Sequence, residues 1–324
     1  MNILICGGAG YIGSHMAKML ATLDHKITVF DNFSTGYRQA VKWGELAEGD
    51  LLDQNALDQL FNKQSFDAVM HFSAKSLVGE SMSNPALYYR NNVIGTVNLL
   101  DAMVKYEVKK FVFSSSASTF GNPLKDFIDE THPQNPINPY GQTKLMVERI
   151  LKDYAQAYGL NSVSLRYFNA AGADPEAEIG EAHNPETHLI PNVLKAVLKG
   201  GKRLKVFGKD YATADGTCVR DYIHINDLCT AHLQTLDYMG TKHGAHGFNL
   251  GNGKGFSILE IIEAAQKVVG CEIPFDYEER RPGDPATLVA DSTLIHKELG
   301  WQADYTELEE ILATAWKWHQ AQKW

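Results

Sequence analysis

The chain has 324 residues, of which 44% are hydrophobic and 21% are charged, and its formal net charge at pH 7 is −9. These values are ordinary for a globular protein and exclude a disordered or fibrous chain. The length predicts one large α/β unit or two closely associated domains. The negative charge argues against nucleic acid or an acidic membrane surface as a partner, because such partners attract positively charged proteins.

Targeting segments and metal sites are not indicated by the sequence. No run approaches the ~18 consecutive apolar residues of a membrane span, and the N-terminus has no signal-peptide pattern, so we expect a cytoplasmic protein without a membrane partner. His243 and His246 lie in a glycine-broken loop without another ligand at metal-binding spacing, so we expect no metal. The four cysteines contain no CxxC pair and predict reduced thiols: Cys6, Cys218, Cys229 and Cys271.

Short apolar runs alternate with longer helical patterns over the first half of the chain. This alternation predicts an α/β fold with a Rossmann-type, doubly wound parallel sheet. The helical pattern over residues 85–105 has apolar side chains at three- and four-residue steps, which predicts one core-facing helix. The predicted strands are Asn2–Cys6, Lys26–Asp31, Asp67–Phe72, Lys110–Ser114 and Ser162–Phe168.

A glycine-rich loop, GGAGYIG over Gly7–Gly13, follows the first predicted strand and precedes an amphipathic helix. Asp31 ends the next strand, 18 residues beyond Gly13. This context is typical of a dinucleotide-binding unit, in which glycines admit the pyrophosphate and the helix N-terminus donates N–H groups. Asp31 suits the hydroxyls of the adenine ribose and repels a 2′-phosphate, which favours NAD over NADP. A glycine turn without a ligand is the alternative interpretation.

Tyr140 and Lys144 stand four residues apart after Pro139, so a helix that begins there places both on one face. The same YxxxK spacing occurs at two other places in the chain, so spacing alone does not identify a site. Tyr140 differs in position, because it follows the predicted strand Lys110–Ser114 and the serine run Ser114-Ser115-Ser116. Ligands bind at the carboxyl ends of such parallel strands.

Tyr140, Lys144 and Ser116 are the predicted catalytic residues. A tyrosine pKa near ~10 makes a weak base at neutral pH, but an adjacent ammonium and a positively charged nicotinamide both favour the phenolate. Ser116 can hydrogen-bond the reacting hydroxyl and steer its proton. The alternative for Ser116 is a strand-end serine that only satisfies backbone groups.

The sequence pattern changes in the second half of the chain, where loops rich in Gly, Asn and Pro are followed by shorter predicted elements. We expect residues 1–172, completed by segments near 217–250, to form the NAD-binding domain. Residues 173–324 are expected to form mainly a smaller, mixed α/β substrate-binding domain. Capping boxes at Ser257-x-x-Glu260 and Thr306-x-x-Glu309 predict the starts of two late helices.

Almost end to end, the chain resembles the extended short-chain dehydrogenase/reductase superfamily and, within it, the UDP-glucose 4-epimerases. The motifs that carry the resemblance are specific as a set. They are GGAGYIGSH, HFSAKSLVGES, YYRNNVIGT, SSSAS-x-F-G, NPYGQTKLMVE, LRYFNAAGA, HLIPNVL, VFGKDY, DGTCVRDYIHINDL, FNLG and RRPGDP.

The resemblance implies a set of NAD-binding residues and a set that binds a UDP-sugar. For NAD it implies Gly7, Gly10, Tyr11, Ile12, Gly13, Asp31, Asn32, Ser34, Thr35, Gly36, Asp50, Leu51, Phe72, Ser73, Ala74, Ser76, Asn91, Lys144 and Phe168. For the UDP-sugar it implies Ser116, Tyr140, Asn169, His188, Leu189, Phe207, Arg220, Arg281 and Asp284.

Physical chemistry agrees with the implied substrate residues. Arg220 and Arg281 offer forked donors suited to a diphosphate, Phe207 offers a face for uracil, and Asp284 offers an acceptor for ribose. Three of these residues have a structural alternative. Arg220 could pair with the neighbouring Asp221, Arg281 could pair with a nearby glutamate at position 278 or 279, and Phe207 could belong to the core.

The resemblance implies a reaction at C4 of the sugar. C4 gives hydride to NAD+ while Tyr140 takes the O4 proton, and the 4-keto sugar turns and recovers the hydride on its other face. The implied activity is that of a homodimeric UDP-glucose/UDP-galactose 4-epimerase of galactose metabolism.

Other functions stay open at the level of sequence. They are epimerisation of N-acetylhexosamine or pentose UDP-sugars, a nucleotide-sugar dehydrogenase or reductase that releases NADH, and an NAD-sensing binder. A 4,6-dehydratase needs an acid and a base to expel water, whereas Ser116-Ala117-Ser118 supplies no carboxyl group.

Four residues depart from what relatives carry. Phe120 replaces a tyrosine, Ser76 lies where some members have lysine, and His188 lies where others have asparagine. Lys75 is a neighbouring candidate to replace the missing lysine. Leu288 lies at a pocket-wall position where members differ, and its intermediate size leaves the acceptance of N-acetylated sugars open.

Overall fold

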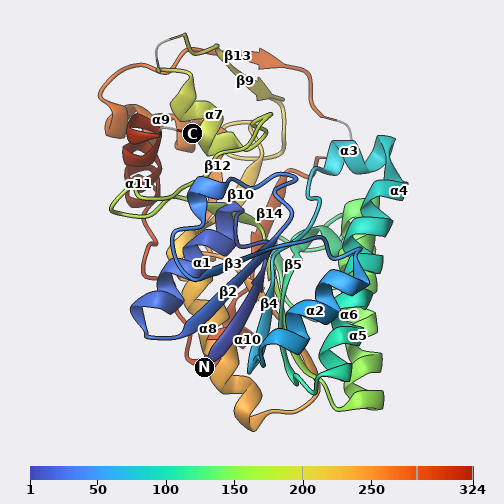
Figure 1. Ribbon diagram of the computed structural model, residues 1–324. Helices are drawn as coiled ribbons and strands as arrows, with labels where there is room; N and C mark the ends of the chain where they lie inside the picture. Colours follow the sequence, from blue (N-terminus) through green and yellow to red (C-terminus); the bar gives the residue numbers. More distant parts are fainter. Residues whose placement is uncertain (199, 282–283, 323) are drawn as a thin grey trace. The chain divides into compact units, whose positions relative to one another are not determined.

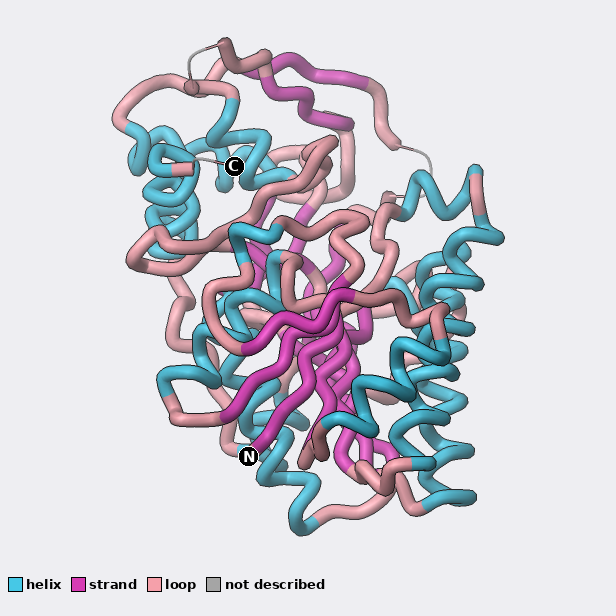
Figure 2. The backbone as a smooth tube through the Cα atoms, in the orientation of Figure 1, coloured by secondary structure: helices cyan, strands magenta, loops and turns pink. Residues whose placement is uncertain are grey.

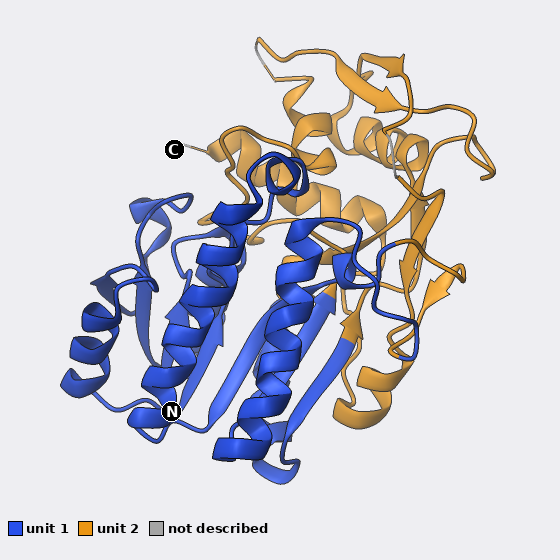
Figure 3. Cartoon of the chain, turned by 90° about the vertical axis from the view of Figure 1, so that its right-hand side faces the viewer, with its two compact units in different colours: residues 1–121, 131–166, 229–248 blue, residues 122–130, 167–228, 249–324 orange. Residues whose placement is uncertain are grey.

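The computed structural model describes residues 1–198, 200–281, 284–322 and 324. The chain divides into two compact units (Figure 3). The first comprises residues 1–121, 131–166 and 229–248, and the second comprises residues 122–130, 167–228 and 249–324. The proposed functional boundary between residues 172 and 173 lies inside the second unit, because the chain enters that unit at Tyr167.

The first unit is built on the predicted Rossmann-type sheet, which has seven strands (Figure 1). Strands β1 (Asn2–Cys6), β2 (Lys26–Asp31), β3 (Glu45–Glu48), β4 (Ala68–His71) and β5 (Lys110–Ser116) pair in parallel, which confirms the fold class. The prediction missed β3, because its sequence ELAE is largely exposed and has no apolar run, and it also missed β11. In spatial order the strands are β11 (Ala245–Leu250), β7 (Asn161–Tyr167), β5 (Lys110–Ser116), β4 (Ala68–His71), β1 (Asn2–Cys6), β2 (Lys26–Asp31) and β3 (Glu45–Glu48).

Helices flank both faces of this sheet (Figure 2). Leucine, phenylalanine and methionine side chains of α2 (Gln54–Lys63), α5 (Gly95–Lys105) and α6 (Pro139–Tyr158) pack on one face as a single hydrophobic cluster. The predicted helix over residues 85–105 consists of α4, a π-helical turn over Tyr89–Ile94, and α5. The helices of this unit are α1 (Tyr11–Thr22), α2 (Gln54–Lys63), α3 (Val78–Ser83), α4 (Pro85–Tyr88), α5 (Gly95–Lys105) and α6 (Pro139–Tyr158), and α8 (Ile225–Thr241) enters it from the second unit.

The second unit contains a five-stranded sheet and a separate two-stranded parallel ladder. In the larger sheet β10 (Val219–His224) lies between β12 (Gly255–Ser257) and β14 (Thr287–Ala290). β10 also pairs with β8 (Asn169–Ala171), and β14 pairs with β6 (Phe127–Ile128). The smaller ladder joins β9 (Leu204–Phe207) to β13 (Phe275–Glu278). The expected mixed α/β character of the second half is therefore present.

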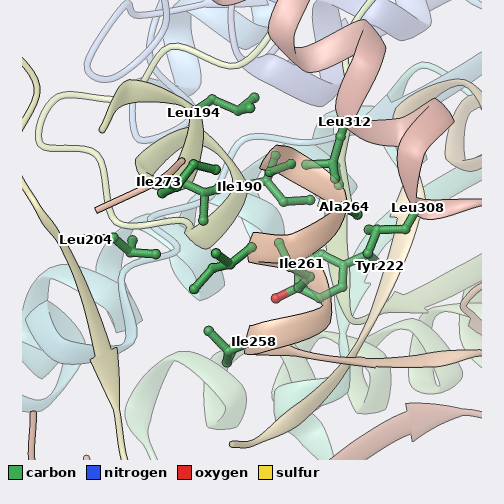
Figure 4. Packing of buried hydrophobic residues seen from close by; sticks show 14 of the residues in the cluster. Ile190, Leu194, Leu204, Tyr222, Ile258, Ile261, Ala264, Ile273, Leu308 and Leu312 are labelled. Atoms are coloured by element: carbon green, nitrogen blue, oxygen red, sulfur yellow. The ribbon is translucent and has the colours of Figure 1, made fainter. Parts of the chain in front are cut away.

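Three helices of the second unit share one hydrophobic cluster (Figure 4). They are α7 (Leu189–Lys195), α9 (Ile258–Val269) and α11 (Leu308–Ala321), and α10 (Thr293–Leu299) follows β14. The predicted capping box at Ser257 and Glu260 is confirmed. The one at Thr306 is wrong, because α11 starts later, with Glu307 as its N-cap. Among the described residues, no helix is long and apolar enough to cross a membrane.

Candidate cofactor and substrate sites

The glycine loop joins β1 to α1 with almost no free space around two of its glycines. Gly7 has φ +84°, and a Cβ there would lie 2.6 Å from the backbone N of Ser73. A Cβ on Gly13 would lie 2.8 Å from the Cα of Gly8 and closer still to the carbonyl of Gly7. Gly10, the N-cap of α1, is less crowded, with its nearest neighbour at 3.4 Å, and no side chain caps the helix. The N-terminus of a helix presents backbone N–H groups, which suit an anion.

Asp31 ends β2 beside this loop and is 9% exposed. One carboxylate oxygen accepts a hydrogen bond from the Ala9 N–H at 2.9 Å, and the other accepts from the Phe33 N–H at 2.8 Å. Burial raises the pKa of Asp31, while the backbone hydrogen bonds oppose that rise. Asp31 therefore also holds the glycine loop in place.

A cleft of about 540 Å³ opens at the carboxyl ends of β1, β2 and β4. Most residues predicted for NAD line it, and so do three that the prediction missed. The lining residues are Gly7, Gly10, Phe30, Asp31, Asn32, Ser34, Thr35, Gly36, Gly49, Asp50, Leu51, Phe72, Ser73, Ala74, Lys75 and Asn91. The other predicted cofactor residues are not among those that line it: Tyr11, Ile12, Gly13, Ser76, Lys144 and Phe168.

Lys75, and not the exposed Ser76, lines the cleft. The buried Asn92 holds Lys75 in place: its side-chain oxygen accepts from the Lys75 N–H at 2.9 Å, and its amide donates to the Lys75 carbonyl at 3.0 Å. The same amide donates to the Thr143 hydroxyl at 3.1 Å. Sequence reasoning missed Asn92 because its polar side chain is not part of the apolar stripe of the predicted helix, and because its partners, Lys75 and Thr143, are distant in the chain.

The predicted catalytic residues of the first unit lie on α6 and at the end of β5. α6 begins at Pro139, after Asn138 accepts a capping hydrogen bond from the Gly141 N–H at 2.8 Å. The buried Lys144 donates to the Ser114 carbonyl at 2.6 Å, and its Nζ lies 5.8 Å from the centre of the Tyr140 ring. The proposed catalytic side chains of α6 therefore face the carboxyl end of β5.

The ionisation of the two α6 residues is set mainly by burial. Burial lowers the pKa of Lys144 to about 7, against the charge of Glu148, which raises it. Burial raises the pKa of Tyr140, whereas a hydrogen bond from Ser116 lowers it. Ser116 also accepts from the Ser118 N–H at 3.1 Å. The chain by itself does not supply the lowered tyrosine pKa that general-base chemistry needs.

Three neighbouring strands of the second unit carry predicted substrate residues. Asn169 on β8 pairs in register with Tyr222 of β10 and donates to the Asp221 carbonyl at 2.7 Å. Arg220 of β10 is in register with Leu288 of β14. The strands therefore bring these side chains to one sheet.

Arg220 pairs with Asp284 and not with its neighbour Asp221. Its Nη2 lies 3.6 Å from the Asp284 carboxylate, and its Nη1 donates to the Val219 carbonyl at 2.8 Å. The buried Asp221 carboxylate instead accepts from three backbone N–H groups, of Asn252, Gly253 and Ala290. The alternative interpretation of Arg220 is thus wrong, and two predicted substrate residues contact each other.

Arg281 packs on Phe207. The guanidinium carbon lies 4.0 Å from the centre of the Phe207 ring, which ends β9 and is partly exposed. Glu278, one of the glutamates considered as its partner, pairs with Lys205 at 2.9 Å. The two residues that follow Arg281 in the RRPGDP motif lie outside the described residues.

His188 precedes Leu189, the first residue of α7, and belongs to a network of charged groups. The buried Glu181 carboxylate accepts from His188 Nδ1 and from His183 Nδ1, the latter at 3.0 Å. Glu186 accepts from the His188 N–H at 3.0 Å and from Lys195 at 3.2 Å. The prediction missed this network because the spacing E-x-H-x-x-E-x-H matches none of the metal motifs considered.

The ligand atoms of Glu181, His183, Glu186 and His188 lie within 4.8 Å of one another, which is a spacing that could hold a metal ion. Burial disfavours the charged forms, but the ion pairs outweigh it. The pKa of Glu181 falls to about 2, and that of His183 rises to about 9. Protonated histidines and Lys195 thus balance the two carboxylates.

Comparisons with known proteins agree along the whole chain. A family profile described as GDP-mannose 4,6 dehydratase matches residues 4–314. The chain is 48% identical over 320 residues to the UDP-glucose 4-epimerase of Halalkalibacterium halodurans, covering 99% of this chain and 96% of that protein.

Solved structures show the same fold. The UDP-glucose 4-epimerase from Brucella ovis in complex with NAD is 48% identical, with a TM-score of 0.95, over 98% of this chain and 97% of that one. The UDP-Glc/GlcNAc 4-epimerase of Campylobacter jejuni is 41% identical, with a TM-score of 0.86, over 99% of each chain. The chain therefore belongs to the nucleotide-sugar family that the GDP-mannose 4,6 dehydratase profile describes, and within it to the UDP-glucose 4-epimerase family.

Proposed function

We propose that this protein interconverts UDP-glucose and UDP-galactose, in galactose metabolism, with NAD held through the turnover. The observation that carries the proposal is the meeting of Ser116, Tyr140 and Lys144 at the carboxyl end of β5. Relatives with the same activity in their names match this chain over nearly its full length, which supports the assignment.

NAD fits the cleft of the first unit. The crowded Gly7 and Gly13 bring the loop close to the ligand, and the uncapped N-terminus of α1 suits a pyrophosphate. Lys75 lines the cleft and brings a positive charge to it. When bound, NAD accepts hydride from C4 of the sugar and returns it. Asp31 lines the cleft with a carboxylate, which favours NAD over NADP.

The chain's own residues move the O4 proton. Tyr140 takes this proton as C4 is oxidised and gives it back as C4 is reduced. Ser116 hydrogen-bonds the Tyr140 hydroxyl and stabilises its phenolate form. The ammonium of Lys144 acts in the same direction by charge, and the Ser114 carbonyl fixes its position. Because burial raises the pKa of Tyr140, the positive charge of the oxidised nicotinamide is a further requirement for the phenolate.

The UDP part of the substrate is assigned to the second unit. Arg220 and Arg281 are the diphosphate donors, Asn169, His188 and Leu189 complete the polar and backbone contacts, and Phe207 offers the ring face that Arg281 leaves uncovered. Asp284 then either shares Arg220 or binds ribose. In this proposal a UDP-sugar replaces part of the existing contact between Arg220 and Asp284.

Dehydration is disfavoured although the family profile is named for a dehydratase. Ser116-Ala117-Ser118 carries no carboxyl group to protonate a leaving hydroxyl.

Epimerisation of N-acetylated UDP-sugars is the second candidate function, supported by the dual name of the Campylobacter jejuni relative and by the partly buried Leu288 beside Arg220. A homodimer in the cytoplasm completes the proposal; the free thiols of all four cysteines support that compartment.

The test uses purified protein with UDP-galactose and no added cofactor. We expect UDP-glucose to form until the two sugars reach equilibrium, and NAD to be released when the protein is denatured. Separate incubations with UDP-N-acetylglucosamine and UDP-xylose define the range of sugars. Release of one NADH per sugar consumed would instead identify a dehydrogenase.

A further inference from the structure

We propose that Glu148 is a positioning residue of this reaction, locking the helix that carries Tyr140 and Lys144 onto the strand end that carries Ser116. Glu148 lies on α6, four residues beyond Lys144 and eight beyond Tyr140, so the three share one helix face. It is 4% exposed. The inference rests on the proposed function, because it concerns the same proton transfer.

Every acceptor position of the Glu148 carboxylate is used. Oε1 accepts from the Ser115 hydroxyl at 2.6 Å and from Arg166 Nε at 2.9 Å. Oε2 accepts from Arg166 Nη2 at 2.7 Å and from the Gln134 amide at 3.1 Å. A carboxylate offers about four such positions. The group is therefore fixed in orientation as well as in place.

These bonds act on the strand end that the reaction uses. Ser115 lies between Ser114, whose carbonyl binds Lys144, and Ser116, whose hydroxyl binds Tyr140. Glu148 and Lys144 thus hold two consecutive residues of β5 from one helix. A small shift of α6 along β5 would separate Tyr140 from Ser116.

Arg166, which donates twice to Glu148, lies on the neighbouring strand β7. It is 7% exposed, and its guanidinium lies 5.6 Å from the Phe120 ring. A Cβ on Gly247 would come within 2.7 Å of its Nη2. The aromatic ring at position 120 therefore packs on the cation, which is a role that needs no tyrosine hydroxyl.

Glu148 also carries the negative charge that opposes the burial of Lys144. Burial raises the pKa of Glu148, but hydrogen bonds and charge from Arg166 outweigh it, so the group stays ionised. Among the described residues, His71 and Tyr140 are further titratable groups near Lys144. His71 has a pKa of about 3 and is neutral, and Tyr140 is protonated in the resting chain. Removing the Glu148 charge therefore lowers the pKa of Lys144 further.

The test compares Glu148→Gln with Asp153→Asn, a control on the exposed face of the same helix. For Glu148→Gln we expect kcat at neutral pH to fall about tenfold or more, with little change in KM. The alkaline limb of the plot of kcat against pH should shift by roughly one unit to lower pH, because Lys144 then loses its proton at a lower pH. Asp153→Asn should match the parent. A folded Glu148→Gln with the parent's kcat and pH profile would overturn the proposal.

Two further measurements separate the charge of Glu148 from its position. Glu148→Asp retains the charge, so it should restore the pH profile while kcat stays low. Spectroscopic titration of the Tyr140 phenolate, read against Tyr140→Phe, requires no epimerase activity and should show a higher tyrosine pKa in Glu148→Gln. If the parent protein fails to epimerise, the proposed function fails, whereas an unchanged tyrosine pKa in Glu148→Gln counts against Glu148 alone.

Discussion

The proposed cofactor cleft of the first unit and the proposed substrate residues of the second are held in shape in different ways. Backbone shapes the cleft: Gly13 has no room for a Cβ, and two backbone N–H groups hold Asp31. In the second unit, side chains hold one another, as Arg220 does with Asp284 and Arg281 with Phe207. A backbone-built site keeps its shape before its ligand arrives, whereas paired side chains must exchange partners. We therefore expect the first to control retention of NAD and the second to set the affinity for the sugar nucleotide.

The largest effect is expected from Gly13→Ala, which attacks the backbone-built site. The added Cβ would meet the backbone of Gly7 and Gly8, which cannot move aside as a flexible side chain could. We expect the purified variant to have lost essentially all bound NAD, measured after denaturation. Gly79→Ala is the control, because its Cβ meets nothing within 4 Å. Parent-like NAD content in Gly13→Ala would contradict the account of a preformed loop.

The variant Tyr140→Phe separates the binding of NAD from the catalytic proton transfer. It removes the proton-transfer hydroxyl and keeps the ring, so kcat should fall by at least roughly a hundredfold. NAD content should stay at the parent level, because Tyr140 does not line the cleft. Steady-state kinetics and cofactor content measure the two effects. Near-normal turnover would remove Tyr140 from the reaction.

Arg220→Met tests the side-chain-built site. Losing a charged donor to the diphosphate should raise KM for UDP-glucose about tenfold or more, with NAD content unchanged. Asp284→Asn is the matched variant, since it releases Arg220 from its ion pair without removing it. Its KM should change less than that of Arg220→Met. A parent-like KM in Arg220→Met would exclude Arg220 from the diphosphate site.

The smallest effect concerns the network around His188. The raised pKa of His183 means that its stabilisation is complete below its unfolded pKa of 6.5 and is lost as the pH rises through about 9. His183→Gln should therefore lower the free energy of unfolding by about 1 kcal/mol under mildly acidic conditions and by less in alkali. Urea unfolding across that range measures it. An equal loss at both ends would show that His183 is neutral.

Local sequence patterns predicted the elements correctly where a motif and its partners lie close in sequence. β1 and β2 have the predicted bounds, and α6 begins at Pro139 as the YxxxK face requires. The sequence pattern could not show that Lys75 lines the cleft and Ser76 does not, because this depends on the hydrogen bonds between Asn92 and the Lys75 backbone. The partners of Arg220 and His188 were also missed. Folding brings these partners together into ion pairs, and neither the periodicity of hydrophobic residues nor the spacing of motifs predicts such pairs.

Deuterium at C4 of UDP-galactose gives the most direct test of the central claim, that hydride leaves and returns within one turnover. After conversion in ordinary water without added cofactor, we predict that the UDP-glucose formed retains the label at C4. Tyr140→Phe should slow this conversion without releasing label. Deuterium lost to water, or recovered in free NADH, would contradict the account.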